Sequence, residues 1–424
     1  MPSSETTSRY RWLICSLLFW ATTINYLDRQ ILSLLKPMLD HQLGWSNAQF
    51  GAVNSVFQGA YGVSLFVFGW IIDRYGTRRG YALSISAWSI AAICHAFVNS
   101  ISGFFGARIL LGLGEGGNFP AAIKATAQWF PRKERALATS LFNSGANIGA
   151  VIAPMVVPPV ADAFGWHAAF VLAGLAGFVW VAAWLPLFAE PRESRRVSAA
   201  ELAYIEADKQ AGDDGPFEKV TWGRVLKHRE AWAFVVAKFV TDPIWWFFLT
   251  WLPDFFKKTR GLDIKGSALM LASIYGVVTV LSIAGGWLTG HLMKMGWSVS
   301  RARKTGLMVF ACMVLPLMLV SSSSNWTAVL LIGLAGAGHQ AWSANLYTSV
   351  SDIFPKRAVA TLTGIGGAAG ALGGMLFPVI VGLILDHMKA GGYTLIFGFC
   401  SVAYLIALGL HSLLAPSFEP VEFD

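Results

Sequence analysis

Long apolar segments recur along the whole chain and are separated by short polar connections. Each is close to the length of a membrane-spanning helix, which needs about 20 apolar residues. We predict twelve such helices, over residues 12–34, 49–72, 80–99, 102–128, 136–158, 166–189, 232–253, 267–292, 305–323, 326–349, 358–385 and 392–414. The pattern therefore predicts an all-α polytopic membrane protein.

One polar segment, residues 191–230, is much longer than the other connections and divides the predicted helices into six and six. We expect an N-terminal six-helix bundle (1–190), a central cytoplasmic loop (191–230) and a C-terminal six-helix bundle (231–424). Within the loop, Ser198 and Glu201 have the spacing of a capping box, which predicts a short helix from Ser198 to Lys209. The linker expected after it covers residues 212–215.

Basic residues follow the second, fourth, eighth and tenth predicted helices, whereas most of the alternate connections contain few. The clearest groups are Arg74, Arg78 and Arg79, then Arg132, Lys133 and Arg135. Loops rich in Lys and Arg stay on the cytoplasmic side of a membrane. We therefore predict that both termini are cytoplasmic.

Composition agrees with a membrane protein, because 55% of the 424 residues are hydrophobic and only 13% are charged, against about 25% in soluble proteins. The net charge of +8 resides in short loops, which favours a lipid bilayer over nucleic acid as the partner. The four cysteines lie in apolar segments without metal-binding spacing. We find no catalytic arrangement, metal site or cofactor motif, so we do not expect an enzyme.

The first predicted helix carries a carboxylate and a guanidinium side by side, Asp28 and Arg29. Each costs about 2.5–3.5 kcal/mol at the centre of a membrane helix, and such residues face a bundle interior or a water-filled cavity. We expect this pair to line a transport pathway.

The fourth predicted helix carries Arg108, Glu115 and Asn118. Arg108 and Glu115 are two turns apart and therefore share a helix face. Burial favours the neutral form of Glu115, whereas a nearby arginine favours its anion. A proton-coupling site needs this balance, and we assign Asp28, Glu115 and Arg108 to it. The alternative is a permanent ion pair with a purely structural role.

Other polar and aromatic residues inside the predicted helices are candidate substrate ligands. They are Gln58, Tyr61, Asn143, Asn147, Lys238, Trp245, His339, Gln340 and Asn345, in addition to Arg29 and Asn118. Amide, hydroxyl and imidazole groups suit the hydroxyls of a sugar, but each could instead bond a neighbouring helix. Lys238 and Asp242 are one helical turn apart and could neutralise each other.

The loop after the second helix, Gly69 to Arg79, matches the pattern G-x-x-x-D-R-x-G-x-R-R and so resembles the signature of the major facilitator superfamily. Gly69 would allow close helix approach and Gly76 a tight turn. Asp73 could cap a helix or pair with an arginine. The candidate latch residues are Gly69, Asp73, Arg74, Gly76 and Arg78. The glycines of residues 364–374 predict close packing in the eleventh helix.

Four further stretches resemble the anion:cation symporter branch of that superfamily, and bacterial hexuronate transporters in particular. They are Asn25-Tyr26-Leu27-Asp28-Arg29, Glu115-Gly-Gly-Asn118-Phe-Pro120, Trp129-Phe-Pro131-Arg-Lys-Glu134-Arg135 and Phe142-Asn143-Ser144-Gly145. The resemblance implies a fold of two six-helix bundles. It also implies that Arg29 holds a substrate carboxylate and that Asp28 and Glu115 exchange protons.

These observations together predict a monomeric, proton-coupled symporter that imports a hexuronate (glucuronate or galacturonate) across the bacterial inner membrane by alternating access. Another sugar acid, such as galactonate or glucarate, or another organic anion is the alternative substrate. A multidrug antiporter fits less well, because Gly145, Gly149 and Pro154 poorly match the glycine–proline pattern expected in its fifth helix.

Overall fold

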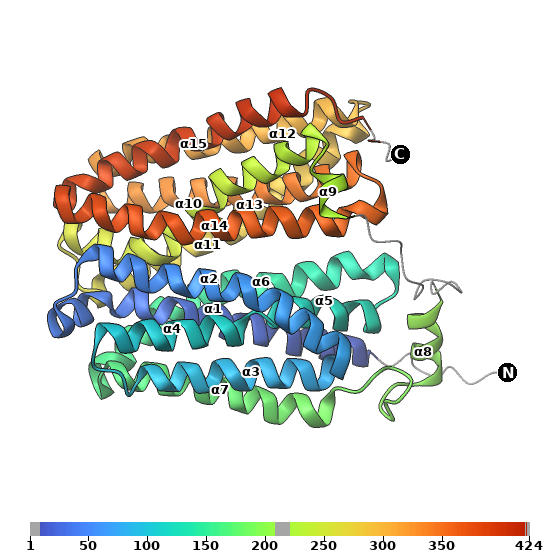
Figure 1. The fold of residues 1–424 in the computed structure, drawn as a ribbon, viewed down its shortest axis with the longest axis horizontal. Coiled ribbons are helices and arrows are strands. Elements are labelled where there is room, and N and C mark those ends of the chain that lie inside the picture. The colour runs from blue at the N-terminus through green and yellow to red at the C-terminus, as the bar shows by residue number, and fades with distance from the viewer. Residues whose placement is uncertain (1–8, 208–220, 420, 422–424) are drawn as a thin grey trace. The chain divides into compact units, whose positions relative to one another are not determined.

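The computed structural model describes residues 9–207, 221–419 and 421, and every regular element in these ranges is helical (Figure 1). The first half contains α1 (Tyr10–Leu43), α2 (Asn47–Tyr75), α3 (Thr77–His95), α4 (Ile101–Glu115), α5 (Asn118–Trp129), α6 (Arg132–Phe164), α7 (Trp166–Leu187) and α8 (Ala199–Glu206). The second half contains α9 (Trp222–Val225), α10 (Arg229–Arg260), α11 (Ile264–Lys294), α12 (Val299–Val314), the 3₁₀ helix η1 (Leu315–Ser322), α13 (Asn325–Ile353), α14 (Lys356–Met388), the 3₁₀ helix η2 (Lys389–Gly391) and α15 (Gly392–Leu414).

The predicted all-α fold is confirmed, and each of the twelve predicted spans coincides with helical segments. Within the described residues, seven helical stretches are long and apolar enough to cross a membrane by length and composition alone. The helix α1 is not among these seven, and it contains the charged residues Asp28, Arg29 and Lys36. The helix α1 is therefore long enough to cross a membrane, but it carries charged side chains within its length.

The predicted fourth helix is broken in two, which corrects the expectation of one continuous span over residues 102–128. It ends as α4 at Glu115 and restarts as α5 at Asn118, with Gly116 and Gly117 between them. A Cβ atom on either glycine would overlap a serine side chain, that of Ser64 on α2 or Ser84 on α3. The helices α2 and α3 therefore pack closely against the chain at the break. The break directly follows Glu115, a candidate proton-coupling residue.

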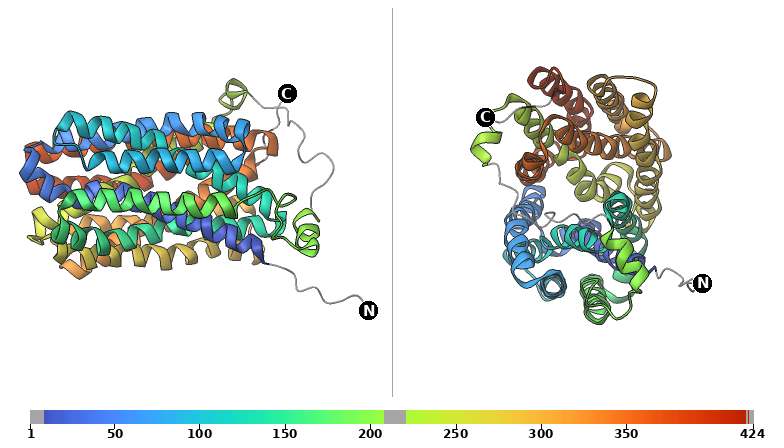
Figure 2. Two further views of the ribbon diagram at one scale, coloured as in Figure 1. Left: turned by 90° about the horizontal axis from the view of Figure 1, so that it is seen from below. Right: turned by 90° about the vertical axis from the view of Figure 1, so that its right-hand side faces the viewer.

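Contacts group the chain into two compact units. The first takes in the described parts of residues 1–32 and 59–215, and the second those of residues 33–58 and 216–424. The last turns of α1 and the first turns of α2 thus pack with the second unit rather than with their neighbours in sequence. Within each unit the long helices run roughly parallel and are seen end on in Figure 2. The division at residues 190 and 230 follows chain order and stays a prediction.

Small residues allow α6 to pack directly on α1 in the first unit. A Cβ atom on Gly145 would overlap the carbonyl oxygen of Phe19, and one on Gly149 would overlap that of Thr23. From the opposite side, the indole of Trp180 on α7 donates a hydrogen bond to the Leu17 carbonyl at 2.8 Å. The helix α1 is therefore fixed between α6 and α7 along the turns that precede Asp28.

The glycines of α14 play the same part in the second unit. Side chains or backbone of α10 occupy the space where Cβ atoms of Gly366, Gly370, Gly373 and Gly374 would lie. These positions fall on one helix face. The close packing predicted for residues 364–374 is confirmed.

The short helix of the central segment, α8, is confirmed over residues 199–206, with Ser198 as its N-cap. The Ser198 hydroxyl accepts a hydrogen bond from the Glu201 N–H at 3.2 Å. The Glu201 carboxylate does not complete a capping box. It accepts instead from the backbone N–H groups of Tyr10 and Arg11, at 3.2 and 3.1 Å, and so caps α1. Lys209 and the linker predicted at residues 212–215 lie outside the described residues.

The contact of Gly145 with α1 predicts a specific loss of stability. Gly145→Leu should lower the melting temperature of the detergent-solubilised protein, because overpacking of a tight contact costs about 1–3 kcal/mol or more. The matched control is Gly106→Leu on α4, where the structure has nothing within 4 Å of the new Cβ atom. Equal melting temperatures for the two variants, measured by tryptophan fluorescence, would contradict this account of the α1–α6 contact.

Candidate functional site

A buried ion pair joins α1 to the end of α4 in the first unit. The Nε atom of Arg29 donates to Oε2 of Glu115 at 2.6 Å, and the side chains are 4% and 0% exposed. Two elements position this pair. The packing of α1 on α6 and α7 fixes Arg29, and the break at Gly116 ends α4 directly after Glu115.

Two tyrosine rings enclose the guanidinium of Arg29. Its Cζ atom lies 5.0 Å from the ring centroid of Tyr26 and 4.5 Å from that of Tyr61. An arginine over aromatic faces gains cation–π stabilisation that increases as water is removed. The arrangement keeps the guanidinium in place while its planar donor edge can meet a carboxylate.

Asp28 and Arg108 complete a cluster of four buried charged groups. Asp28 is 2% exposed and Arg108 is 1% exposed, and Asp28 interacts electrostatically with Glu115, Arg108 and Arg29. Among the residues that the structure describes, neither carboxylate oxygen of Asp28 has a hydrogen-bond partner. The first unit therefore brings together the three residues predicted for proton coupling and the arginine predicted for substrate binding.

The other candidate ligands of the first unit differ in environment. Asn118 is fully buried, accepts a hydrogen bond from the Tyr81 hydroxyl at 2.6 Å and lies 3.5 Å from the Thr22 hydroxyl. Its amide thus links α5 to α3 and α1. Asn143 is exposed on α6, and Asn147 is half-buried one turn later. These two amides present polar groups at the surface of the first unit.

Lys238 is a buried cation of the second unit, where it pairs with Asp242 on the same helix. The Nζ–Oδ2 distance is 2.6 Å, and the ammonium also lies 4.6 Å from the ring centroid of Tyr347. The structure has the ion pair with Asp242 that the spacing allowed as an alternative, and the role of Lys238 in substrate binding stays a prediction. The Asp242 carboxylate occupies the space left by the missing side chain of Gly370.

His339 and Trp245 are stacked in the second unit, with ring centroids 5.5 Å apart and planes 3° from parallel. The imidazole Nδ1 of His339 lies 2.6 Å from the Tyr404 hydroxyl, which in turn donates to the Thr241 carbonyl. The histidine is therefore held by α10 and α15. Gln58 is buried on α2, in the part of that helix that packs with the second unit, and its Oε1 atom has no hydrogen-bond partner among the described residues.

Gln340 and Asn345 differ although both lie on α13. Gln340 is half-buried. Asn345 is 3% exposed, and its amide exchanges two hydrogen bonds with Arg303 on α12, at 2.9 Å to the backbone carbonyl and 3.2 Å from the guanidinium. The hydrogen-bonding capacity of Asn345 is used to pack α13 on α12, a context that spacing along the chain does not reveal.

The latch motif after α2 is partly as predicted. Gly76 has φ +83° and makes the turn between α2 and α3. Arg74 is exposed, whereas the Arg78 guanidinium donates to the Leu185 carbonyl. No described atom lies within 4 Å of a Cβ built on Gly69, so the role of this glycine in close helix approach stays a prediction.

The partner of Asp73 in the first unit is a lysine and not the predicted arginine, whereas a helix cap by Asp73 stays a prediction. Asp73 pairs with Lys124 on α5 at 2.7 Å, and the ammonium also donates to the Ile72 carbonyl at 3.2 Å. The Asp73 side chain is 78% exposed, and exposed pairs contribute only about 0–1 kcal/mol. Such a contact is weak enough to break during a conformational change.

Three contact residues were not among the predicted site residues: Tyr26, Tyr347 and Lys124. Tyr26 precedes Arg29 by one helical turn, a spacing that is itself a signal for a cation–π contact. The contacts of Tyr347 with Lys238, and of Lys124 with Asp73, join different helices. No spacing along the sequence encodes them.

Comparison with known proteins supports this account of the fold. Residues 18–378 match the Major Facilitator Superfamily. The hexuronate transporter of Escherichia coli K12 is 30% identical over 399 residues, covering 93% of this chain and 92% of that protein. The similarity to hexuronate transporters expected from the motifs is confirmed.

Relatives that are named for other substrates are about equally similar. The probable galactarate/D-glucarate transporter GudP of Bacillus subtilis 168 is 31% identical over 418 residues, covering 93% of this chain and 90% of that protein. The D-galactonate transporter of Escherichia coli O6:H1 is 28% identical over 422 residues, with 95% and 94% covered.

Solved structures share the fold at low sequence identity. A bacterial homologue of the human lysosomal transporter Spinster, in an inward-facing and occupied conformation, has a TM-score of 0.76 at 16% identity and covers 97% of this chain and 98% of that one. A D-xylose–proton symporter has a TM-score of 0.71 at 15% identity, with 95% and 97% covered. The chain is therefore a multi-pass membrane transporter, not an enzyme, and it belongs to the Major Facilitator Superfamily.

Proposed function

We propose that the protein is a proton-coupled symporter that imports a hexuronate across the bacterial inner membrane by alternating access, as a monomer with both termini in the cytoplasm. The observation that carries the proposal is the buried Arg29–Glu115 pair beside Asp28. The similarity to a hexuronate transporter over most of both chains supports the substrate class.

Arg29 is the proposed ligand of the substrate carboxylate. An arginine binds a carboxylate through two parallel N–H···O bonds, which fixes orientation as well as charge. In the structure one of its nitrogens is engaged by Glu115 at 2.6 Å. A substrate carboxylate would therefore compete with Glu115 for the same guanidinium.

Proton coupling follows from this competition. When Glu115 takes up a proton it no longer offers a full negative charge to Arg29, and the guanidinium becomes available to the substrate anion. The two arginines and two acids of the cluster then keep their charge balance, because one carboxylate replaces another. Removal of a charged partner from a buried pair is otherwise strongly unfavourable, by about 3–5 kcal/mol.

Asp28 is the proposed second proton carrier. A buried ionised carboxylate without hydrogen-bond donors is costly, and neither oxygen of Asp28 has such a partner among the described residues. This environment supports a neutral Asp28 in the conformation described. Its ionisation would then accompany the rearrangement that opens the site to the other side.

Another sugar acid is the alternative substrate, because relatives named for galactarate/D-glucarate and D-galactonate are about as similar to this chain as the hexuronate transporter. All these substrates present a carboxylate and a row of hydroxyls. Arg29 would bind the carboxylate of each of these substrates in the same way. A multidrug antiporter has no such support.

Substrate and coupling can be tested together in proteoliposomes. We expect labelled glucuronate to undergo counterflow, with competition by galacturonate and none by glucose. A pH gradient of one unit, acidic outside, should drive about tenfold accumulation for each proton carried. Competition by galactonate or glucarate alone would change the substrate assigned to the protein and leave the proposed mechanism unchanged. The absence of uptake of any sugar acid would contradict the role of Arg29.

Two substitutions separate binding from coupling. Arg29→Lys keeps the charge but loses the planar fork, so glucuronate counterflow should fall by about tenfold or more. Glu115→Gln should retain counterflow and lose pH-driven accumulation. Glu206→Gln is the matched control, because its partner is the exposed Arg192 on the same central segment. Accumulation by Glu115→Gln that equals the control would exclude Glu115 as a coupling residue.

A double-mutant cycle distinguishes a functional pair from a structural one. Arg29→Met and Glu115→Leu should each destabilise the protein by about 3–5 kcal/mol, since each leaves a buried charge unpaired. The double variant should recover most of the melting temperature yet fail to transport. A double variant that is stable and still accumulates glucuronate would show the pair to be dispensable.

A further inference from the structure

The end of α4 receives hydrogen bonds from two neighbouring helices of the first unit. The last carbonyl groups of an α-helix have no partner within that helix. Here the Leu113 carbonyl accepts from the Ser64 hydroxyl on α2. The next carbonyl, that of Gly114, accepts from the Ser84 hydroxyl on α3 at 2.6 Å. We call these two contacts the serine caps.

The serine caps are buried and closely fitted to the glycines that follow Glu115. Ser64 is 1% exposed, and Ser84 is fully buried. A Cβ atom on Gly116 would overlap the Ser64 hydroxyl, and one on Gly117 would overlap that of Ser84. The hydroxyls therefore reach the end of α4 because these two positions have no side chain.

The direction of the serine caps sets them apart from other hydroxyls of the same unit. A serine or threonine inside a helix can donate to the carbonyl four residues earlier. Thr22 does so to Leu18 at 3.1 Å, and Thr23 does so to Phe19 at 2.9 Å. The serine caps join one helix to another, and the two donors come from different helices. They therefore fix a particular turn of α4 in space.

The serine caps also explain why the helix is interrupted. In a continuous helix the carbonyls of residues 113 and 114 would accept from the N–H groups of residues 117 and 118. A side chain that inserts into this series of hydrogen bonds bends or interrupts a helix. The two hydroxyls insert at the carbonyls where α4 ends, three or four residues before α5 begins at Asn118.

The start of α5 is held separately, by Asn118. Its Oδ1 atom accepts from the Tyr81 hydroxyl on α3 at 2.6 Å, and its amide nitrogen lies 3.5 Å from the Thr22 hydroxyl on α1. Side chains of other helices therefore hold the chain on both sides of the interruption. Glu115 lies between these two anchors.

The position of Glu115 decides whether its ion pair can form. Its carboxylate lies 2.6 Å from Nε of Arg29, and Glu115 directly follows the second capped residue, Gly114. A hydrogen bond needs both a short distance and a suitable direction. If α4 and α5 joined into one helix, Glu115 would lose the fixed helix end that places it opposite Arg29.

We propose that Ser64 and Ser84 are positioning residues for Glu115. By capping adjacent carbonyls at the end of α4, they keep the helix interrupted and hold the Glu115 carboxylate at hydrogen-bond distance from Arg29. The proposal rests on the proposed function only where it concerns proton coupling. The positioning of the ion pair itself involves no substrate.

The test compares the effect of one substitution on stability in different backgrounds. Glu115→Gln removes the charge that pairs with Arg29 and should lower the melting temperature of the detergent-solubilised protein. In the Ser64→Ala/Ser84→Ala background the pair is already loosened. The same substitution should then lower the melting temperature by about half as much or less, since effects of coupled residues do not add. Equal losses in the parent and in this background would overturn the proposal.

Ser89→Ala is the matched control on α3. Ser89 is fully buried, as Ser84 is, but its hydroxyl has no hydrogen-bond partner among the described residues. The loss of melting temperature caused by Glu115→Gln should be the same in this background as in the parent. A reduced loss here as well would indicate general loosening around α3 and would also overturn the proposal.

Two single variants replace the double variant if it does not fold. Ser84→Cys keeps the size of the side chain but has only a weak donor, and Gly117→Ala pushes the Ser84 hydroxyl away from its carbonyl. Each should reduce the effect of Glu115→Gln on the melting temperature. Gly106→Ala, with nothing within 4 Å of the new Cβ atom, should not. Unreduced effects in both single variants would contradict the proposal.

Transport measurements separate this proposal from the proposed function. Glucuronate counterflow should persist in the Ser64→Ala/Ser84→Ala variant, whereas pH-driven accumulation should fall below that of Ser89→Ala. Unchanged accumulation, in a protein whose Glu115→Gln variant has lost it, would contradict the positioning role. If the parent carries no glucuronate, the proposed function fails, and the melting temperatures still decide whether the serines position Glu115.

Discussion

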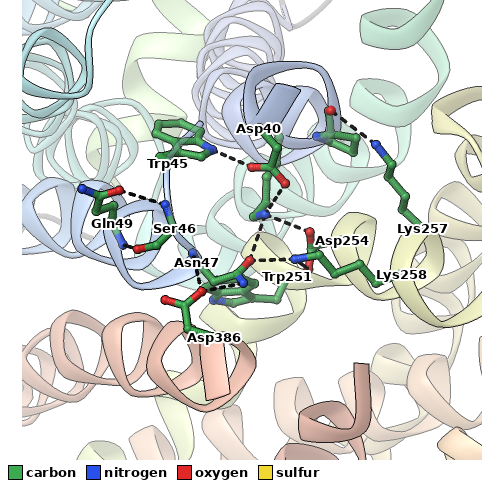
Figure 3. A network of polar contacts seen from close by, with 12 residues as sticks. Asp40, Trp45, Ser46, Asn47, Gln49, Trp251, Asp254, Lys257, Lys258 and Asp386 are labelled. Carbon is green, nitrogen blue, oxygen red and sulfur yellow. Dashed lines mark hydrogen bonds and ion pairs between the residues drawn. The ribbon is translucent and has the colours of Figure 1, made fainter. Parts of the chain in front are cut away.

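The requirement that every buried charge has a partner governs this structure, because the hydrocarbon interior of a membrane supplies no water to solvate it. Among the buried pairs of the described helices are Arg29 with Glu115, Lys238 with Asp242, and Lys36 with Asp254 (Figure 3). Only the second of these three lies within one helix turn. The other two join helices far apart in sequence, so the same contacts that solve the charge problem also decide which helices stay together.

Close packing at small residues also holds helices together, in addition to the ion pairs. The glycines of α6 and α14 bring whole helices into backbone contact, α6 onto α1 and α14 onto α10. Rigid pairs of this kind hold charged side chains in place without flexible intermediaries. The proposed chemistry then needs only the exchange of one carboxylate for another at a fixed guanidinium. The distinction between rigid helix pairs and exchangeable polar contacts runs through both units.

The sequence alone predicted the helical fold, the superfamily and the positions of the charged residues inside the spans, because apolar length and helical spacing are local properties. The spacing also allowed the Lys238–Asp242 pair, which lies within one turn. It did not predict that Gly116 and Gly117 break the fourth span, that Asp73 pairs with Lys124, or that Asn345 is occupied by Arg303. These features depend on neighbouring helices. The roles of the candidate site residues in binding and coupling remain predictions.

The cap that Glu201 places on α1 has a mechanical consequence. Glu201 lies in the central segment, yet it holds the backbone and guanidinium of Arg11 at the beginning of the helix that carries Arg29. Arg29 follows Arg11 by 18 positions, which correspond to about 27 Å of helix. The helix α1 thus connects the central segment at one end with the buried guanidinium of Arg29 further along. A displacement of α8 would therefore be transmitted through Glu201 to the start of α1, and along α1 to the proposed binding site.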